Sequence, residues 1–92
     1  MAKNEKVFKF YSDPGHGWLA VPIKDLAPVN LKVTDFSPYS YIRGKTVYLE
    51  EDCDATMFIL QYQFMNGGEK PKYIEKYTDG THPIRSYDRI PT

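Results

Sequence analysis

The segment at residues 52–65 constrains the fold most, because none of its residues from the fourth onward is charged. The acidic residues at its head suit the positive end of a helix dipole, and Asp52 or Asp54 fits the N-cap position. Asn66 and Gly67 form a good C-terminal stop. Apolar and polar residues also alternate in its second half, as they do in a strand. The signals at both ends favour a helix, with a strand as the alternative.

A helix over these residues would present two adjoining apolar faces. The first holds Phe58, Tyr62 and Met65, and the second holds Met57, Leu60, Gln61 and Phe64. Helices at a protein surface normally carry charged residues on the outer face. We therefore expect this helix to be covered on more than one side, either by the C-terminal segment of the chain or by another protein.

Ninety-two residues leave room for only one hydrophobic core, so we expect a single domain over residues 1–92. Hydrophobic residues make up 41% of the chain and the formal net charge is zero, a balance that excludes disorder. Cys53, the single cysteine, excludes both a disulfide scaffold and a zinc site built from cysteines. The longest apolar run is too short for a membrane span, and the polar start lacks the features of a signal peptide.

Alternating residues separated by turn signals predict two hairpins. The first covers residues 6–23, with a type II turn at Asp13-Pro14-Gly15 and its end at Pro22. The second covers residues 39–49. One helical turn is expected at 23–27, closed off by Pro28, and residues 29–38 are expected to be irregular and to send Leu31, Val33 and Phe36 into the core.

Further strands are expected at residues 73–78 and, as an edge strand, at 84–90, with the hairpin-type turn signal Asp79-Gly80 between them. In the second of these, Arg85, Tyr87 and Arg89 would share one side. The sequence therefore predicts an α+β protein, a small antiparallel β-sheet with one main α-helix packed on it.

Catalytic and metal signals are weak. His16 lies three residues after Asp13 and would serve as a general base, but no nucleophile accompanies it, and His82 reads as an ordinary loop residue. The two histidines and Cys53 match no zinc spacing, and four neighbouring acids would keep the thiol unreactive. The acidic block lacks an EF-hand pattern, and no glycine-rich phosphate loop is present. We expect no enzyme, no metal and no cofactor.

Tyrosine and arginine form the strongest functional signal. Eight of the residues are tyrosines, and six of them gather near basic side chains in two parts of the chain, around positions 39–48 and 73–89. Tyr and Arg dominate protein-interface hot spots and also stack on single-stranded bases. With the acidic block, the predicted partner-binding residues are Tyr39, Tyr41, Arg43, Lys45, Glu50, Glu51, Asp52, Asp54, Arg85, Tyr87 and Arg89. A zero net charge without a basic stripe argues against binding duplex DNA alone.

Four blocks of the chain resemble small proteins of bacteriophages and mobile elements. They read YSDPGHGWL at 11–19, SPYSY at 37–41, VYLEEDCD at 47–54 and PIRSY at 83–87. The resemblance implies a helix after the acidic block, no enzymatic activity and a place in the host cell cytoplasm. It also implies binding to host machinery, in the sharpest form as an anti-CRISPR protein that docks on a crRNA-guided complex of Cas proteins and blocks target DNA hybridisation.

The sequence thus predicts a non-enzymatic interaction protein whose partner is a host protein or ribonucleoprotein complex. The acidic block would occupy basic sites intended for phosphates, while Arg43, Lys45 or Arg85 would meet acidic or RNA surfaces. A single-stranded nucleic-acid-binding accessory protein is the alternative, and a small hydrolase built on His16 and Asp13 comes third.

Overall fold

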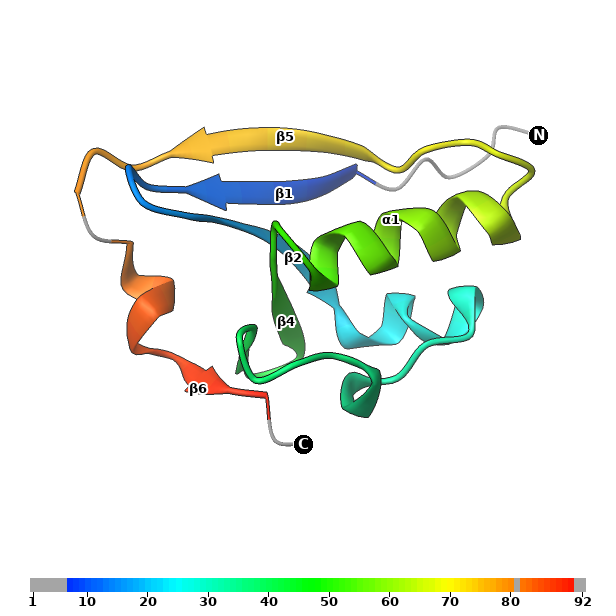
Figure 1. The fold of residues 1–92 in the computed structure, drawn as a ribbon, viewed down its shortest axis with the longest axis horizontal. Helices are drawn as coiled ribbons and strands as arrows, with labels where there is room; N and C mark the ends of the chain where they lie inside the picture. The colour runs from blue at the N-terminus through cyan, green and yellow to red at the C-terminus, as the bar shows by residue number, and fades with distance from the viewer. Residues whose placement is uncertain (1–6, 81, 91–92) are drawn as a thin grey trace.

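A six-stranded sheet carries the fold in the computed structural model, which describes residues 7–80 and 82–90. The strands are β1 (Val7–Ser12), β2 (Gly17–Pro22), β3 (Tyr41–Arg43), β4 (Thr46–Glu50), β5 (Lys72–Tyr77) and β6 (Asp88–Arg89). They lie in the order β5-β1-β2-β4-β3-β6, as Figure 1 shows in part. Only β1 and β5 pair in parallel. With the helix α1 (Asp54–Met65) packed on it, this sheet confirms the predicted α+β class.

Both predicted hairpins are present. β1 pairs with β2, and β3 pairs with β4, each antiparallel. The type II turn is wrong, because Gly15 does not have the positive φ that such a turn requires. The Asp13 carboxylate shapes this turn instead, since its Oδ1 accepts hydrogen bonds from the backbone N–H groups of Gly15 and His16, each at 3.0 Å.

The predicted edge strand near the C-terminus is confirmed by β6, but it does not pair with β5 as the hairpin-type turn between them indicated. β5 lies at one edge of the sheet beside β1, whereas β6 lies at the other edge beside β3. Between them, the 3-10 helix η4 (Pro83–Ser86) replaces the first three residues of the strand expected at 84–90, of which β6 keeps two. The cause is the side chain of Ile84, which is fully buried against Trp18 and Tyr41 and draws the chain across the sheet.

Three short 3-10 helices join the two hairpins. η1 (Ile23–Asp25) and η2 (Ala27–Val29) supply the helical turn predicted near residue 25, although Pro28 lies inside η2 and does not end it. η3 (Val33–Asp35) follows within the segment expected to be irregular. The three core contacts predicted there are present: Phe36 is fully buried, and Leu31 and Val33 are partly buried.

Residues 54–65 form the predicted helix, but its N-cap differs from the expected one. Cys53 occupies the N-cap position and makes no capping hydrogen bond through its side chain, so the assignment of Asp52 or Asp54 was wrong. The predicted stop is confirmed, because Gly67 has a φ of 66° and Gly68 N–H donates to the Gln63 carbonyl at 2.7 Å. The helix links β4 to β5, which run in the same direction and therefore need a crossover connection.

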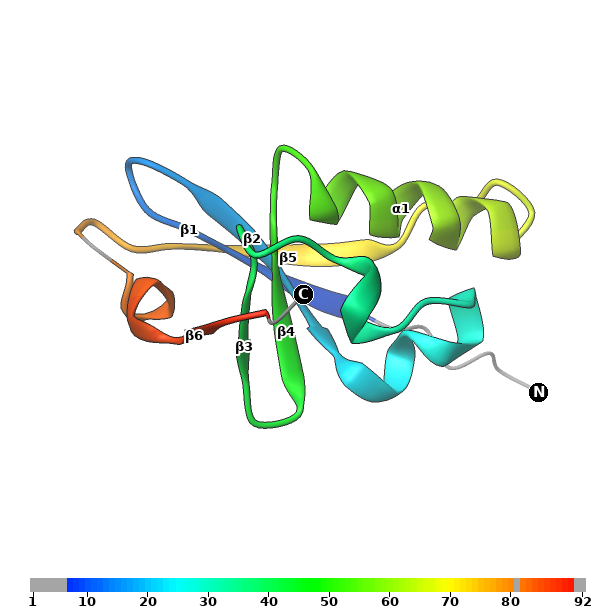
Figure 2. The same ribbon diagram turned by 60° about the horizontal axis from the view of Figure 1, so that its bottom comes forward.

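Each face of the sheet has its own hydrophobic cluster. On one face, sheet residues such as Phe8, Leu19 and Val47 pack against Phe58 of α1 and against the 3-10 helices. The rings of Phe8 and Phe58 meet edge to face, with their centroids 5.5 Å apart. The second cluster is aromatic and consists of Trp18, Tyr41 and Ile84, with Tyr11, Tyr48 and Tyr87 packed around them. Figure 2 shows that α1 and η4 lie on opposite sides of the molecule.

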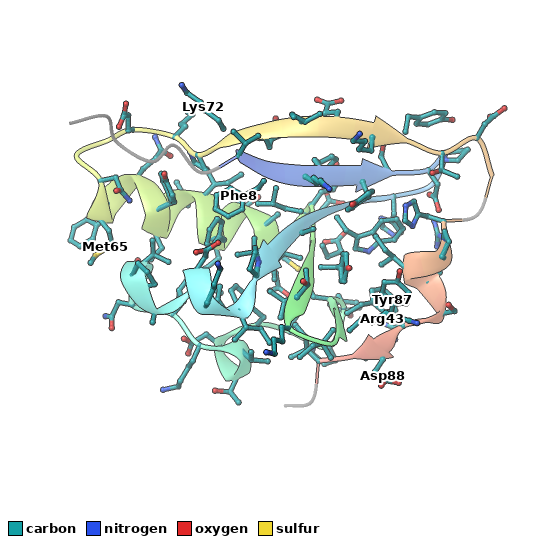
Figure 3. The ribbon with its side chains drawn as sticks, turned by 180° about the vertical axis from the view of Figure 1, so that it is seen from behind. Phe8, Arg43, Met65, Lys72, Tyr87 and Asp88 are labelled. Atoms are coloured by element: carbon teal, nitrogen blue, oxygen red, sulfur yellow. The ribbon has the colours of Figure 1, made fainter. Side chains whose placement is uncertain are left out.

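The expected cover over α1 is missing from the described part of the chain. The helix packs on the sheet and against η2. Its remaining surface exposes Leu60, Phe64 and Met65, and Figure 3 shows Met65 at the C-terminal end of the helix. The C-terminal segment does not cover these residues, because β6 lies at the far edge of the sheet. Within the described residues, no helix is long and apolar enough to cross a membrane.

Two phenylalanines of α1 test this packing. Phe58→Ala is expected to lower the free energy of unfolding by about 3–5 kcal/mol, because it leaves a cavity in the main core. Phe64→Ala, at a side chain that is 81% exposed, is expected to change it by less than about 0.5 kcal/mol. Urea unfolding followed by circular dichroism measures both. Equal losses in the two variants would contradict the orientation of the helix.

Candidate functional site

A hollow of about 430 Å³ opens on the aromatic face of the sheet. Its walls come from four parts of the chain: the β1–β2 turn, the loop before β3, the end of β4, and the segment from η4 to β6. The lining residues are His16, Trp18, Tyr39, Tyr41, Glu50, Asp52, Cys53, Arg85 and Arg89. More than half of the predicted partner-binding residues line these walls, which makes the hollow the candidate functional site.

The pairing of β2 with β4 explains why His16 meets the acidic block. Trp18 is the register partner of Glu50, and the Glu51 N–H donates to the Gly17 carbonyl at 3.1 Å, which continues the ladder beyond the strands. Side chains alternate between faces along a strand. His16 and Trp18 on one strand, and the two acids that flank Glu51 on the other, therefore point to the same face.

The side chains of His16 and Glu50 meet in the hollow. Nδ1 of His16 lies 3.3 Å from Oε2 of Glu50, whose side chain is only 10% exposed. The other carboxylate oxygen of Glu50 accepts a hydrogen bond from the Asp52 N–H at 2.9 Å. His16, Glu50 and Asp52 each offer one ligand atom, and these atoms lie within 4.8 Å of one another. The spacing along the chain gives no sign of this cluster, because 33 residues lie between His16 and Glu50.

The acidic block is divided by the structure. Glu50 and Asp52 line the hollow, whereas Glu51 lies on the opposite face, close to Gly17 and to the ring of Phe10. Asp54 is buried, and its Oδ2 accepts hydrogen bonds from the Ser37 N–H and from the hydroxyl groups of Ser37 and Ser40. These hydrogen bonds attach the start of α1 to the loop before β3. Asp54 is therefore not available to a partner.

Asp13 binds Arg85 through two hydrogen bonds. Arg85 Nε donates to Oδ2 at 2.8 Å and Nη2 donates to Oδ1 at 2.9 Å, while the His82 N–H donates to Oδ2 at 3.0 Å. The Arg85 guanidinium, followed by these backbone donors, holds the pKa of Asp13 well below its usual range. Asp13 in turn raises the pKa of Arg85. The hydrolase hypothesis requires the carboxylate of Asp13 to act with His16. Both oxygens of Asp13 accept other hydrogen bonds, and the His16 side chain lies beside Glu50 instead.

His82 has a structural role in the described chain. Its Nδ1 accepts a hydrogen bond from the Ile84 N–H at 3.1 Å, which caps η4. Its ring also packs against Tyr11 and Trp18, with centroid distances of 5.2 Å and 6.1 Å. It therefore helps to hold η4 against the aromatic face and is more than an ordinary loop residue.

In the fold, tyrosines and arginines from the two parts of the chain pack against one another. Arg43 lies over the Tyr87 ring at 4.7 Å (Figure 3), and Arg89 lies over the Tyr41 ring at 5.0 Å. Tyr48 packs on Tyr87 with a ring distance of 5.2 Å, and burial raises its pKa, with Tyr87 contributing less. The two predicted clusters thus merge into one cluster on the aromatic face.

Other predicted residues lie outside this cluster. Tyr73 and Tyr77 are exposed on β5 at the far edge of the sheet. Lys45 is exposed in the β3–β4 turn. In all, six of the eleven predicted partner-binding residues line the hollow: Tyr39, Tyr41, Glu50, Asp52, Arg85 and Arg89. Sequence reasoning missed Trp18, which forms part of the wall and lies beneath Arg85, 5.3 Å from the guanidinium carbon.

Cys53 also lines the hollow, and its pKa is raised. Partial burial contributes most to this shift and the charge of Asp54 adds to it. The direction agrees with the unreactive thiol expected from the sequence, although that expectation rested on the acids alone.

Comparison of the chain with protein-family models, with curated proteins and with solved structures finds no match. The resemblance to phage proteins therefore stays a prediction.

The pair formed by Asp13 and Arg85 predicts a dependence of stability on pH. A carboxylate whose pKa is lowered by folding stabilises the fold above its unfolded pKa, about 3.9, and loses this contribution as the pH falls toward the folded value. Asp13→Asn is expected to be less stable than the parent chain at neutral pH. The difference in the free energy of unfolding should shrink between about pH 5 and pH 2. Urea titrations across this range measure it, and a difference that stays constant would contradict the assignment.

Proposed function

We propose that this protein is a non-enzymatic interaction protein that acts by occupying a surface of a host macromolecule. Its partner is a host protein or ribonucleoprotein complex in the host cell cytoplasm. In its sharpest form, which rests on the resemblance to phage proteins, the proposal is an anti-CRISPR-like inhibitor that docks on a crRNA-guided surveillance complex and blocks target DNA hybridisation.

The composition of the hollow carries the proposal. Tyr39, which is 68% exposed, stands at its rim, while the buried Trp18 and Tyr41 form its inner wall. Arg85 and Arg89 complete the lining. Tyr, Trp and Arg are the residues most enriched in interface hot spots, and such residues act in packed sites from which water is excluded. A concave surface that presents all three types suits a protruding side chain of a partner protein.

The charges in the hollow suit a partner with basic groups. Glu50 and Asp52 both face it, whereas the charge of Arg85 is compensated by Asp13. Complexes that hold a guide RNA and its target do so in channels lined with Lys and Arg. Close charge pairs across an interface contribute roughly 1.5–7 kcal/mol each. This supports Glu50 and Asp52 as the acidic contacts, without Glu51 and Asp54.

The single-strand alternative is less well supported. Nonspecific binding of single strands needs free aromatic faces on which bases stack, next to cationic groups that follow the backbone. Here Arg43, Arg85 and Arg89 lie over rings of the protein itself. These contacts occupy the best aromatic faces of the cluster, so a protein surface remains the better candidate.

Two exposed tyrosines provide a matched test. Tyr39→Ala removes the ring at the rim of the hollow, and Tyr77→Ala removes a ring of similar exposure, 64%, from β5. With a purified crRNA-guided complex, we expect Tyr39→Ala to weaken binding about 30-fold, the size of a hot-spot loss. Tyr77→Ala should bind like the parent chain. Titration calorimetry gives both dissociation constants, and a target-DNA shift assay reports whether hybridisation is blocked.

The same experiment separates the alternatives. If the parent chain does not bind this complex, the anti-CRISPR form of the proposal is wrong, and affinity capture from host cells then tests the broader form. Micromolar binding to naked single-stranded DNA or RNA that weakens steeply with salt would instead support the nucleic-acid alternative. Loss of binding in Tyr77→Ala alone would place the contact on β5.

A further inference from the structure

We propose that the hollow binds one divalent transition-metal ion through His16 Nδ1 and the carboxylates of Glu50 and Asp52. These are the three residues whose ligand atoms lie within 4.8 Å of one another. The inference concerns the free chain and does not depend on the proposed function. In the metal-bound chain, Glu50 and Asp52 would be ligands of the ion and would no longer offer free negative charges to a partner.

The distances fit a small cation. Two ligands that each lie about 2.1 Å from a tetrahedral ion are about 3.4 Å apart. His16 Nδ1 and Glu50 Oε2 are 3.3 Å apart, so this pair already has the required spacing. Asp52 is exposed, and its carboxylate already offers an oxygen within 4.8 Å of the other two ligand atoms.

The backbone fixes two of the three ligands in advance. The Asp52 N–H donates a hydrogen bond to Oε1 of Glu50, which leaves Oε2 facing the His16 imidazole. Asp13 accepts a hydrogen bond from the His16 N–H, and the Glu51–Gly17 hydrogen bond joins the two segments. Groups that orient the ligands in this way strengthen metal binding. They distinguish this cluster from a set of mobile surface acids.

Burial supplies the second reason for a cation. The Glu50 side chain is 90% buried, and a carboxylate removed from water is costly unless a positive charge compensates it. The two arginines of the hollow do not fill this role. Arg85 is bound to Asp13, and Arg89 lies over Tyr41 and donates to the Pro38 carbonyl. A metal ion between the carboxylates and the imidazole would neutralise both acids.

The ligand set indicates the class of ion. An imidazole nitrogen with two carboxylates suits Zn²⁺ and its transition-metal neighbours, whereas Mg²⁺ and Ca²⁺ prefer oxygen ligands alone. The open side of the site faces the hollow, where water or an atom of a partner completes the coordination.

Calorimetric titration of the metal-free full chain with Zn²⁺ tests the proposal. We expect one equivalent to bind, and we expect His16→Ala and Asp52→Asn each to weaken binding by at least about 10-fold. Glu51→Gln is the matched control, because this neighbouring acid lies on the other face of the sheet. It should bind Zn²⁺ like the parent chain, as should Cys53→Ser. Mg²⁺ should bind far more weakly than Zn²⁺.

Three outcomes would overturn the proposal: no stoichiometric Zn²⁺ binding by the parent chain, unchanged binding in His16→Ala, or loss of binding in Cys53→Ser. His16 and Asp52 are exposed, so both variants should keep the circular dichroism spectrum of the parent chain without metal. Backbone amide NMR of the parent chain gives an independent readout. Shifts on Zn²⁺ addition should be centred on residues 16 and 50–52, and shifts centred elsewhere would also overturn it.

Discussion

The carboxylate of Asp13 is the interaction on which the arrangement of the chain depends. It accepts five hydrogen bonds, from the backbone of Gly15, His16 and His82 and from two nitrogens of Arg85. These donors come from both ends of the described chain. These hydrogen bonds join the β1–β2 turn to η4. They therefore fix the path of the chain between β5, at one edge of the sheet, and β6, at the other. The same side chain fixes the backbone of His16 and the side chain of Arg85, which both line the hollow.

A second polar cluster holds the opposite wall of the hollow. The Ser40 hydroxyl donates to Asp54 and accepts a hydrogen bond from the Glu50 N–H at 2.9 Å. This links the loop before β3, the end of β4 and the start of α1. Among the described residues, no buried side-chain nitrogen or oxygen lacks a hydrogen-bond partner. Buried polar groups that are fully paired specify one arrangement of their neighbours, so the walls of the hollow are held by bonds within the protein.

The features that could be predicted from the sequence are those encoded locally. The hairpins and α1 follow from alternation, from turn residues and from the stop at Asn66 and Gly67. The features that were wrong depend on contacts between distant residues. Nothing near β5 shows that it pairs in parallel with β1, and nothing near residue 84 shows that Ile84 is buried against Trp18. The N-cap was misassigned because several acids lie together and Asp54 serves a loop far away in sequence.

The hollow could be predicted only in part, for the same reason. Tyrosine and arginine content together with the acidic block indicated six of its nine lining residues, but not which of them face each other. The cluster of His16 with Glu50 and Asp52 requires the register between β2 and β4. Once that register is known, the alternation of side chains gives the cluster directly. Spacing along the chain carried no signal, because the residues meet across strands that belong to different hairpins.

The position of the last described residues in the fold has a consequence for synthesis. Ile84 is buried in the aromatic cluster and Ile90 in the main core. The aromatic cluster cannot close until residue 87 has left the ribosome, nor the main core until residue 90 has, 83 positions after Val7 at the start of β1. At about 5–20 residues per second, this interval lasts roughly 4–17 s. During it, the nascent chain exposes Phe8 and Trp18 to the chaperones and proteases of the cell.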